Sequence, residues 1–263
     1  MTANIDRRSL WTWLVPQPDI TAAQIEEAAA EHNVVAVPPE RVFLASVAHI
    51  LEEQYGLARS IRERQPVDAG GQPLPLYTYP AIHYLDTLDW SDADIFEFGA
   101  GFSTLWWATR SKTITAVDTD PAWADLLRQR APAQVRVATV AEREIQTALE
   151  AHGSFDVIAI DCAANRFEVA RAAVGHLKPG GIILLDNSEW YYNTAALLRD
   201  ASLIQVDFAG FKPTEFYTSV TSLFIGPGFR ARPKHLPHPP YPLGGKQRHR
   251  ARPQAWDLPA TPA

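Results

Sequence analysis

The sequence predicts an α/β fold in which helices cover both faces of a mostly parallel sheet. Short apolar stretches alternate with helix-forming stretches through the middle of the 263 residues, which is the pattern of parallel strands with helical crossovers. Two final apolar stretches are joined by a Gly/Pro loop too short for a helical crossover, so they should pair antiparallel. Hydrophobic residues make up 46% and charged residues 21%. This composition excludes a collagen-like, coiled-coil or wholly disordered chain.

The first 75 residues are predicted to form a helical front, which we expect to act as a lid or as an oligomerisation element. A capping-box pattern at Thr21 starts a helix that should run to about Asn33. A second helix follows Pro39, and Gly56 is a natural helix end.

The strands and helices of the central region can be placed by hydrophobic pattern. We predict strands over residues 95–98, 113–117, 135–138, 155–160, 182–185, 204–208 and 219–225. We predict helices between them over residues 103–110, 121–130 and 167–177.

The strongest local signal is the turn Glu97-Phe98-Gly99-Ala100-Gly101-Phe102-Ser103-Thr104, where a strand ends, two glycines turn the chain and a helix begins. Glycines let the backbone approach a ligand, and dinucleotide-binding enzymes use a related turn with a third glycine, here replaced by Thr104. Glu97 lies in an otherwise apolar strand end, where a carboxylate needs a partner. A cationic ligand group would be such a partner.

Two side chains beyond the second predicted strand suit a nucleoside. Asp118 lies 17 residues after Gly101, where a carboxylate can accept the hydroxyls of a ribose. Trp123 follows shortly after and either stacks on an adenine or packs into the core. A solvated loop acid is the alternative interpretation of Asp118.

Acids also end the fourth and fifth predicted strands. Asp161 ends one, and Asp186 with Asn187 ends the other. Neighbouring strands lie about 4.8 Å apart, and open α/β sheets bind ligands at this edge. Two carboxylates and an amide oxygen could hold Mg²⁺. The alternative is that these side chains cap loops or bind substrate hydroxyls directly.

Together these motifs resemble class I S-adenosylmethionine-dependent methyltransferases over about residues 76–226. The resemblance implies a Rossmann-like seven-stranded sheet with an antiparallel last strand, and S-adenosylmethionine over the first two strands. Glu97 and the Gly99–Gly101 backbone would meet the methionine half, and Asp118 the ribose. The segment Tyr77-Thr78-Tyr79-Pro80-Ala81-Ile82 is typical of a bacterial branch. The full set of cofactor contacts implied is Tyr79, Glu97, Gly99, Gly101, Ser103, Thr104, Asp118, Trp123 and Asp161.

A narrower resemblance is to catechol O-methyltransferase and its relatives. In those enzymes an Asp after strand four and an Asp-Asn pair after strand five bind Mg²⁺, which implies Asp161, Asp186 and Asn187 as metal ligands here. The segment Cys162-Ala163-Ala164-Asn165 lacks the Lys that those enzymes often use as base. Metal dependence therefore stays open.

Methyl transfer requires an aligned acceptor and a base that removes its proton. The candidate catalytic bases are Asp161, His83 and Glu189, with Tyr191 and Tyr192 as further options. His83 is equally compatible with a structural hydrogen bond. The aromatic side chains at 190–192 either wall an acceptor pocket or pack internally. We expect the acceptor to be a small-molecule hydroxyl, of a sugar or a secondary metabolite.

The net charge of −6 combines two opposite parts. Residues 226–263 hold nine prolines, seven basic residues and one acid, a charge of +6, and the preceding residues carry −12. We divide the chain into the helical front, a methyltransferase domain over residues 76–228 and a basic, Pro-rich tail over 229–263. We expect the tail to lie on the acidic body or on a second subunit. Nucleic acid is the less favoured partner, because an acidic body repels phosphate.

The remaining expectations concern cell type and location. The 19 Arg and 5 Lys indicate a high-GC bacterial genome, and the single Cys162 fits a reducing cytoplasm. No apolar run is long enough for a membrane span. A homo-oligomer is left open. The rival functions are an NAD(P) oxidoreductase, a protein or nucleic-acid methyltransferase and a non-catalytic binding module.

Overall fold

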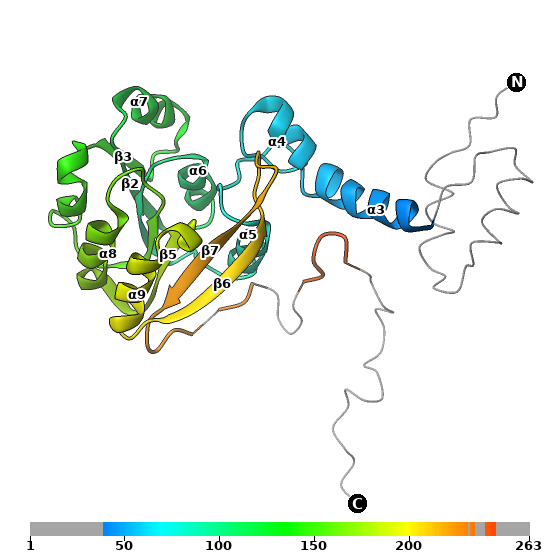
Figure 1. Cartoon of the computed structure of the whole chain (residues 1–263). Helices are drawn as coiled ribbons and strands as arrows, with labels where there is room; N and C mark the ends of the chain where they lie inside the picture. Colours follow the sequence, from blue (N-terminus) through cyan, green and yellow to red (C-terminus); the bar gives the residue numbers. More distant parts are fainter. Residues whose placement is uncertain (1–38, 231, 235–239, 246–263) are drawn as a thin grey trace, which may run out of the picture. The chain divides into compact units, whose positions relative to one another are not determined.

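The chain is described from a computed structural model, which covers residues 39–230, 232–234 and 240–245. Its contacts form two compact units, residues 1–51 and 52–263, and each is described by itself (Figure 1). In the first unit, the helix predicted after Pro39 is α3 (Pro39–His49). It continues into the π-helical turn η1 (Ile50–Gln54). The helix predicted over residues 21–33 lies outside the described residues.

Two helices of the second unit precede the sheet. Before α4 (Leu57–Glu63), Gly56 has a φ of +76°, and a Cβ there would lie 2.4 Å from the backbone nitrogen of Ala69. A left-handed, crowded position of this kind requires glycine. The helix end expected at Gly56 is present, but a new helix starts at once. The next helix, α5 (Tyr79–Asp86), carries Pro80 in its first turn, where the missing N–H costs nothing.

The sheet has seven strands in the order β3-β2-β1-β4-β5-β7-β6. They are β1 (Asp94–Phe98), β2 (Thr113–Asp118), β3 (Val135–Thr139), β4 (Phe155–Ile160), β5 (Leu177–Asp186), β6 (Ile204–Phe211) and β7 (Thr218–Ile225). β7 runs antiparallel to both of its neighbours, and the other strand pairs are parallel. The predicted sheet with an antiparallel last strand is confirmed. β5 begins earlier than predicted, because the segment Pro179-Gly180-Gly181 hides its strand pattern.

Helices cover both faces of this sheet (Figure 1). Alternate strand residues point to opposite faces, so that Ile95 packs with Trp107 of α6 while Phe96 shares a cluster with Val169 of α8. The first face is covered by α5, α6 (Phe102–Ala108) and α7 (Pro121–Arg130). The second is covered by η2 (Glu142–Thr147), α8 (Arg166–Gly175) and α9 (Tyr192–Asp200). α9 and η2 are not among the predicted helices.

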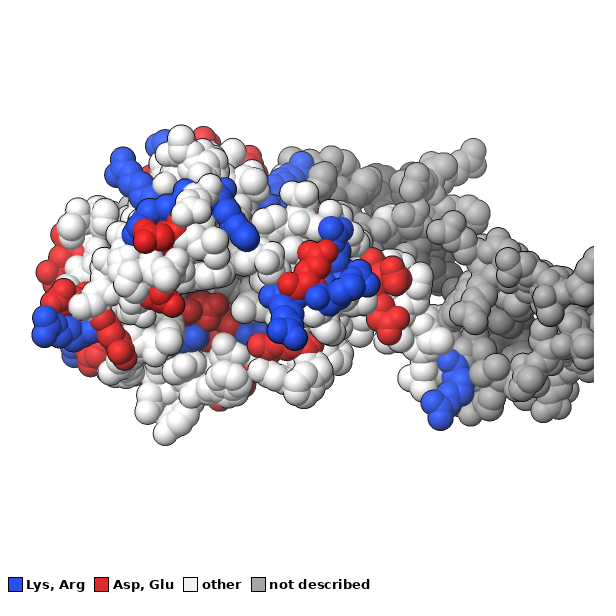
Figure 2. Space-filling view, turned by 90° about the horizontal axis from the view of Figure 1, so that it is seen from above, with Lys and Arg blue, Asp and Glu red and all other residues white. Residues whose placement is uncertain are grey.

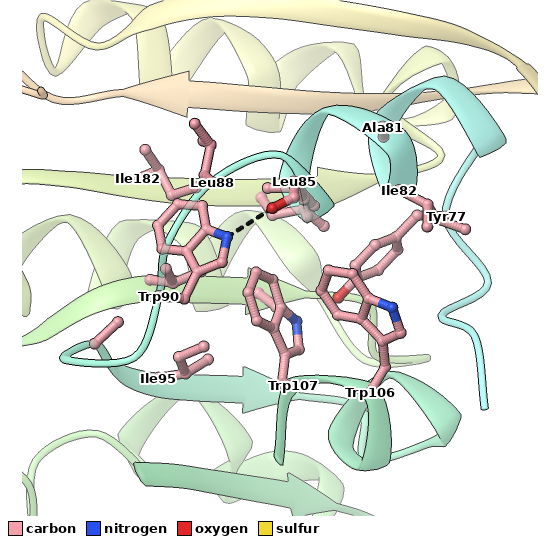
Figure 3. Packing of buried hydrophobic residues seen from close by; sticks show 14 of the residues in the cluster. Tyr77, Ala81, Ile82, Leu85, Leu88, Trp90, Ile95, Trp106, Trp107 and Ile182 are labelled. Carbon is pink, nitrogen blue, oxygen red and sulfur yellow. Dashed lines mark hydrogen bonds between the residues drawn. The ribbon is translucent and has the colours of Figure 1, made fainter. Parts of the chain in front are cut away.

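A cluster of tryptophans fills the first face (Figure 3). The rings of Trp106 and Trp107 meet edge to face with centroids 4.7 Å apart, and Trp90 meets Trp107 at 5.7 Å. The Trp90 indole N–H donates to the carbonyl of Leu85 at 2.8 Å. Because large aromatic rings bury much apolar area and pack in preferred geometries, this cluster ties α5 and α6 to the sheet.

The segment before α5 is bound to the last two strands. The Thr78 N–H donates to Thr221 Oγ1 at 2.9 Å, and its hydroxyl donates to the carbonyl of Phe208 at 2.8 Å. A Cβ on Gly210 would lie 2.8 Å from Pro80, so the backbones approach closely there. These contacts place Tyr77 and Thr78 at the edge of the sheet where the strands end.

The first described residues of the basic tail contact the acidic body. Pro233 forms an antiparallel bridge with Leu88, and the Lys234 N–H donates to the carbonyl of Thr87 at 2.9 Å. Lys234 also pairs with Asp86 at 3.3 Å. The tail residues 235–239 and 246–263 lie outside the described residues.

Candidate functional site

The glycine turn brings the ends of β1 and β4 together. Gly99 has a φ of +91°, and a Cβ there would lie 2.2 Å from the carbonyl oxygen of Asp161. The Asp161 N–H donates to the carbonyl of Phe98 at 2.9 Å. Only glycine permits both the left-handed backbone and this approach. The turn therefore opens the sheet edge to a ligand beside Asp161.

Glu97 is fully buried beneath this turn. Its Oε2 accepts a hydrogen bond from the hydroxyl of Thr104, which accepts one from the Gly101 N–H at 2.9 Å. Its Oε1 has no hydrogen-bond partner within the described part of the chain. Burial raises the pKa of Glu97 to about 8, although the nearby Ser103 and Thr104 hydroxyls oppose the shift. At the position of the third glycine in dinucleotide-binding enzymes, Thr104 thus connects the glycine turn to Glu97.

Asp118 and Trp123 lie beside the same turn. Asp118, at the end of β2, accepts a hydrogen bond from the Asp120 N–H at 2.9 Å. Asp120 caps α7 by accepting from the first-turn N–H groups at 2.9 and 3.2 Å. The half-buried Trp123 donates its indole N–H to the carbonyl of Ala100 at 2.6 Å. Trp123 is therefore held beside the glycine turn, where it also packs against the buried cluster of Ala100, Ala116 and Leu127.

A cavity of about 500 Å³ lies at this edge. Six of the predicted cofactor contacts line it, namely Gly99, Gly101, Ser103, Asp118, Trp123 and Asp161. Arg64 and Arg130 also line it. β7 runs downward in Figure 1, so the other strands of the sheet end at the top of that view. Figure 2 looks down on this end of the sheet and shows acidic atoms deep in a recess, with basic side chains around it. Glu97 and Thr104 do not line the cavity but lie beneath its glycine turn.

Asp161 is held by a buried arginine. Arg166, at the start of α8, donates to Asp161 Oδ1 at 3.0 Å and to the backbone carbonyls of Cys162 and Asp186 at 2.8 and 2.5 Å. Its guanidinium lies over the ring of Tyr191, 4.5 Å from the centroid. Burial and the neighbouring Asp186 raise the pKa of Asp161, and Arg166 opposes this shift. Arg166 therefore joins the ends of β4 and β5.

Asp186 has partners on both carboxylate oxygens. Oδ1 accepts a hydrogen bond from Thr221 at 2.7 Å, and Oδ2 forms an ion pair with Lys212, whose side chain is only 2% exposed. The Asn187 amide satisfies its neighbours when its oxygen faces the Lys212 ammonium, 2.9 Å away, and its nitrogen donates to Asp186 Oδ2 at 2.8 Å. Lys212 thus contacts two of the three side chains that the narrower resemblance assigns to Mg²⁺.

These residues do not fit Mg²⁺. The Lys212 ammonium and the Arg166 guanidinium contact the carboxylates that the ion would need, and like charges repel. In the described part of the chain, no three His, Cys, Asp or Glu side chains cluster in a way that could hold a metal. The carboxylates at these two strand ends are therefore paired with side-chain cations.

Three other predicted site residues lie away from the cavity. His83 is half-buried on α5. Glu189 accepts hydrogen bonds from Ser219 at 2.5 Å and from the Val220 N–H at 3.1 Å, so both of its oxygens tie η3 (Ser188–Trp190) to β7. Tyr79 packs its ring 4.7 Å from that of Tyr55, with its hydroxyl buried and unpaired in the described structure.

Sequence reasoning missed Arg166, Lys212 and Tyr77. Arg166 and Lys212 stand outside every motif that it singled out, and only the fold brings them to the strand ends. Tyr77 belongs to a segment that was singled out, although no role was assigned to it. It is fully buried, its hydroxyl lacks a hydrogen-bond partner among the described residues, and the charges of Glu97 and Asp161 add to burial in raising its pKa.

Comparison with known families identifies the central region. Residues 96–188 match a family model described as a methyltransferase domain. That segment contains the glycine turn, Asp118, Asp161 and Asp186, and it spans the middle of the seven-stranded sheet. This region of the chain is a methyltransferase domain.

Solved methyltransferase structures are similar to this one at low identity. A precorrin-6Y C5,15-methyltransferase from Geobacter metallireducens has 16% identity and a TM-score of 0.46, covering 58% of this chain and 91% of its own. An O-methyltransferase from Bacillus cereus in complex with S-adenosylhomocysteine has 15% identity and a TM-score of 0.44, covering 82% and 96%. Likenesses this distant decide nothing about the acceptor of the present methyltransferase. No curated protein matches the chain in a sequence search.

Within the part of the chain that the structure describes, no helix combines the length and the apolar character that crossing a bilayer needs.

Proposed function

We propose that this methyltransferase transfers the methyl group of S-adenosylmethionine to a hydroxyl of a small molecule, of a sugar or a secondary metabolite. The observation that carries the proposal is the cavity in which the glycine turn, Asp118 and Asp161 meet. The arginine-rich composition and the buried Cys162 support an enzyme of the bacterial cytoplasm.

The cofactor fits the unsatisfied groups at this edge. Glu97 Oε1 is buried without a partner, and a cationic or N–H group of the methionine half would satisfy it. Asp118 has one oxygen engaged with Asp120, and it would accept ribose hydroxyls with the other. Trp123, fixed by Ala100, would offer its ring to the adenine. Bound S-adenosylmethionine supplies an electrophilic methyl group.

Asp161 is the general base that the geometry favours over His83 and Glu189. It lines the cavity, whereas His83 does not, and both Glu189 oxygens are already engaged. Arg166 donates a hydrogen bond to one Asp161 oxygen and so fixes the orientation of the carboxylate. A base must reach the proton that it removes, so the position of Asp161 in the cavity supports its choice.

Titration calorimetry tests the cofactor half of the proposal. We expect S-adenosylhomocysteine to bind with micromolar affinity and NAD⁺ not to bind. Glu97→Gln and Asp118→Asn should each weaken S-adenosylhomocysteine about 10-fold or more, since each removes a charged hydrogen-bond partner. NAD⁺ binding without S-adenosylhomocysteine binding would instead support the oxidoreductase alternative.

Methyl transfer to a panel of phenolic and sugar acceptors tests the base. We expect Asp161→Asn to lower kcat by about 10²–10⁴ and to change S-adenosylhomocysteine affinity less than about threefold. Glu189→Gln serves as the matched control, because its side chain ties η3 to β7 outside the cavity. Equal losses of kcat in the two variants would contradict the assignment.

We further propose that residues 1–75 form a lid or an oligomerisation element. On α3, the apolar side chains of Phe43, Leu44 and Val47 are more than half exposed. Light scattering on the full chain and on a chain lacking residues 1–50 measures the subunit number. A smaller assembly after truncation supports oligomerisation, and an unchanged one with altered acceptor KM supports a lid.

A further inference from the structure

The buried lysine at the strand ends is the least expected group in the molecule. Lys212 follows β6 in the β6–β7 connection and is 1% exposed. Burying an ammonium is costly unless it is paired and hydrogen-bonded. Its ammonium contacts Asp186 Oδ2 and the oxygen of Asn187, so it is anchored by the two polar side chains that end β5.

The charges of this cluster already balance. Asp161 and Asp186 bring two negative charges, and Arg166 and Lys212 bring two positive ones. Thr221 takes the second oxygen of Asp186, and its hydroxyl oxygen accepts the Thr78 N–H. A divalent cation added to these partners would give the buried group a surplus of two positive charges.

We propose that the Lys212 ammonium stands in for the divalent cation at the ends of β4 and β5. It holds Asp186 and Asn187 in place, as a metal held by the same side chains would. Lys212 is a positioning residue, because it acts through Asp186 and Asn187. Methyl transfer at this site therefore needs no divalent cation. The inference concerns the site of the proposed function, but binding of a cation reports on it whatever the acceptor is.

Removing the ammonium should create the metal site that it replaces. In Lys212→Ala, Asp161, Asp186 and Asn187 keep their places on the strand ends, and Asp186 and Asn187 lose the ammonium that contacts them, while Arg166 stays on Asp161. We use Mn²⁺ as the probe and count bound ions by electron paramagnetic resonance. Wild type should show no saturable binding below about 1 mM, and Lys212→Ala should bind one Mn²⁺ at least 10-fold more tightly. The double variant Lys212→Ala with Asp186→Asn should lose that binding.

Lys178 provides a matched control. It also lies between two carboxylates, Asp94 at 2.9 Å and Asp156 at 2.8 Å, and it is one-third exposed. Lys178→Ala should gain no comparable Mn²⁺ affinity, because this pair lacks the amide ligand and the burial of the Lys212 site. A similar gain in both variants would show that any unpaired pair of acids binds the ion, and it would overturn the proposal.

Two further results would overturn it. The first is one tightly bound Mn²⁺ in wild type that Asp186→Asn abolishes. The second is a Lys212→Ala protein that binds S-adenosylhomocysteine like wild type, and is therefore folded, but gains no Mn²⁺ affinity. If Lys212→Ala does not fold, the wild-type measurement and the neutral Lys212→Gln variant decide the question by the same criteria.

Discussion

At the residue scale, two buried carboxylates near the ends of β1 and β5 differ in what surrounds them. Asp186 has both oxygens engaged, by Thr221 and by Lys212. Glu97 has one oxygen bound to Thr104 and the other without a partner among the described residues. Because an unsatisfied buried polar atom costs free energy, Glu97 is the position that gains most from a ligand, and Asp186 is already complete.

Glu97 should give the ligand-free enzyme a characteristic pH dependence. Its pKa of about 8 in the folded protein exceeds the model-peptide value of 4.5, so the folded state holds the proton more tightly. The stability that this contributes is complete below about pH 4.5 and is lost as pH rises through about 8. Relative to Glu97→Gln, the unfolding free energy of wild type should fall by about 1–3 kcal/mol between pH 6 and 9.

Denaturant titrations at several pH values measure this difference. Glu150→Gln, which removes an exposed acid from the surface, should follow wild type throughout. A difference between wild type and Glu97→Gln that stays constant from pH 6 to 9 would show that Glu97 is ionised in the ligand-free fold.

Gly99 should tolerate no side chain. In Gly99→Ala, the Cβ would meet the Asp161 carbonyl at 2.2 Å while φ stays at +91°, so the ends of β1 and β4 must separate. We expect a loss of about 2 kcal/mol or more in unfolding free energy and no measurable S-adenosylhomocysteine binding. Gly153→Ala is the control, since a Cβ there meets nothing within 4 Å. The idea fails if both variants bind S-adenosylhomocysteine equally well.

At the element scale, the segment before α5 and the last two strands form one unit. Thr78 bonds to Phe208 of β6 and to Thr221 of β7, and Thr221 bonds to Asp186 of β5. The Thr221 hydroxyl on β7 therefore connects β7 to β5 and to the segment before α5, although the three are far apart in sequence. This unit also carries Tyr77 and Lys212 to the strand ends.

Thr221→Val should lower the free energy of unfolding, because it removes this hydroxyl. Valine keeps the shape but leaves Asp186 Oδ1 and the Thr78 N–H without their partner, which costs about 1–3 kcal/mol for buried groups. Chemical denaturation measures the loss. Thr218→Val, at an exposed position of the same strand, should change stability by less than about 0.5 kcal/mol. Equal effects would mean that the network contributes nothing.

At the scale of the whole molecule, charge is divided between an acidic body and a basic tail. Lys234 pairs with Asp86 and Arg232 lies 3.5 Å from Asp92, so this part of the tail contacts the body's own acids. These pairs are exposed and individually weak. The backbone bonds of residues 232–234 to the segment after α5 give the contact its register.

This division predicts weak affinity for nucleic acid. Fluorescence anisotropy with labelled RNA and DNA at 150 mM salt should give dissociation constants weaker than about 10⁻⁴ M. Deleting residues 240–263 should leave S-adenosylhomocysteine affinity within about twofold of wild type. Tight RNA or DNA binding that the deletion abolishes would support the nucleic-acid methyltransferase alternative.

Much of the fold is predictable from the sequence because it depends on local patterns. Alternation of apolar strands and helices marks all seven strands, and the short loop before β7 predicts its antiparallel pairing. The glycine turn and Asp118 are found the same way, since they sit at fixed distances from strand ends. α9 and the first residues of β5 are not predicted, because polar residues in α9 and glycines in β5 interrupt the hydrophobic periodicity.

The sequence by itself determined the sheet, the glycine turn and the acids at the strand ends, because each depends on neighbours along the chain. Only the tertiary structure decided what those acids contact. Lys212 lies 26 residues from Asp186 in sequence, and the β5–β7 pairing is what brings them together. Whether Asp161, Asp186 and Asn187 face a metal or a side-chain cation depends on that packing, because burial forces charges to be balanced by whatever lies nearest in space.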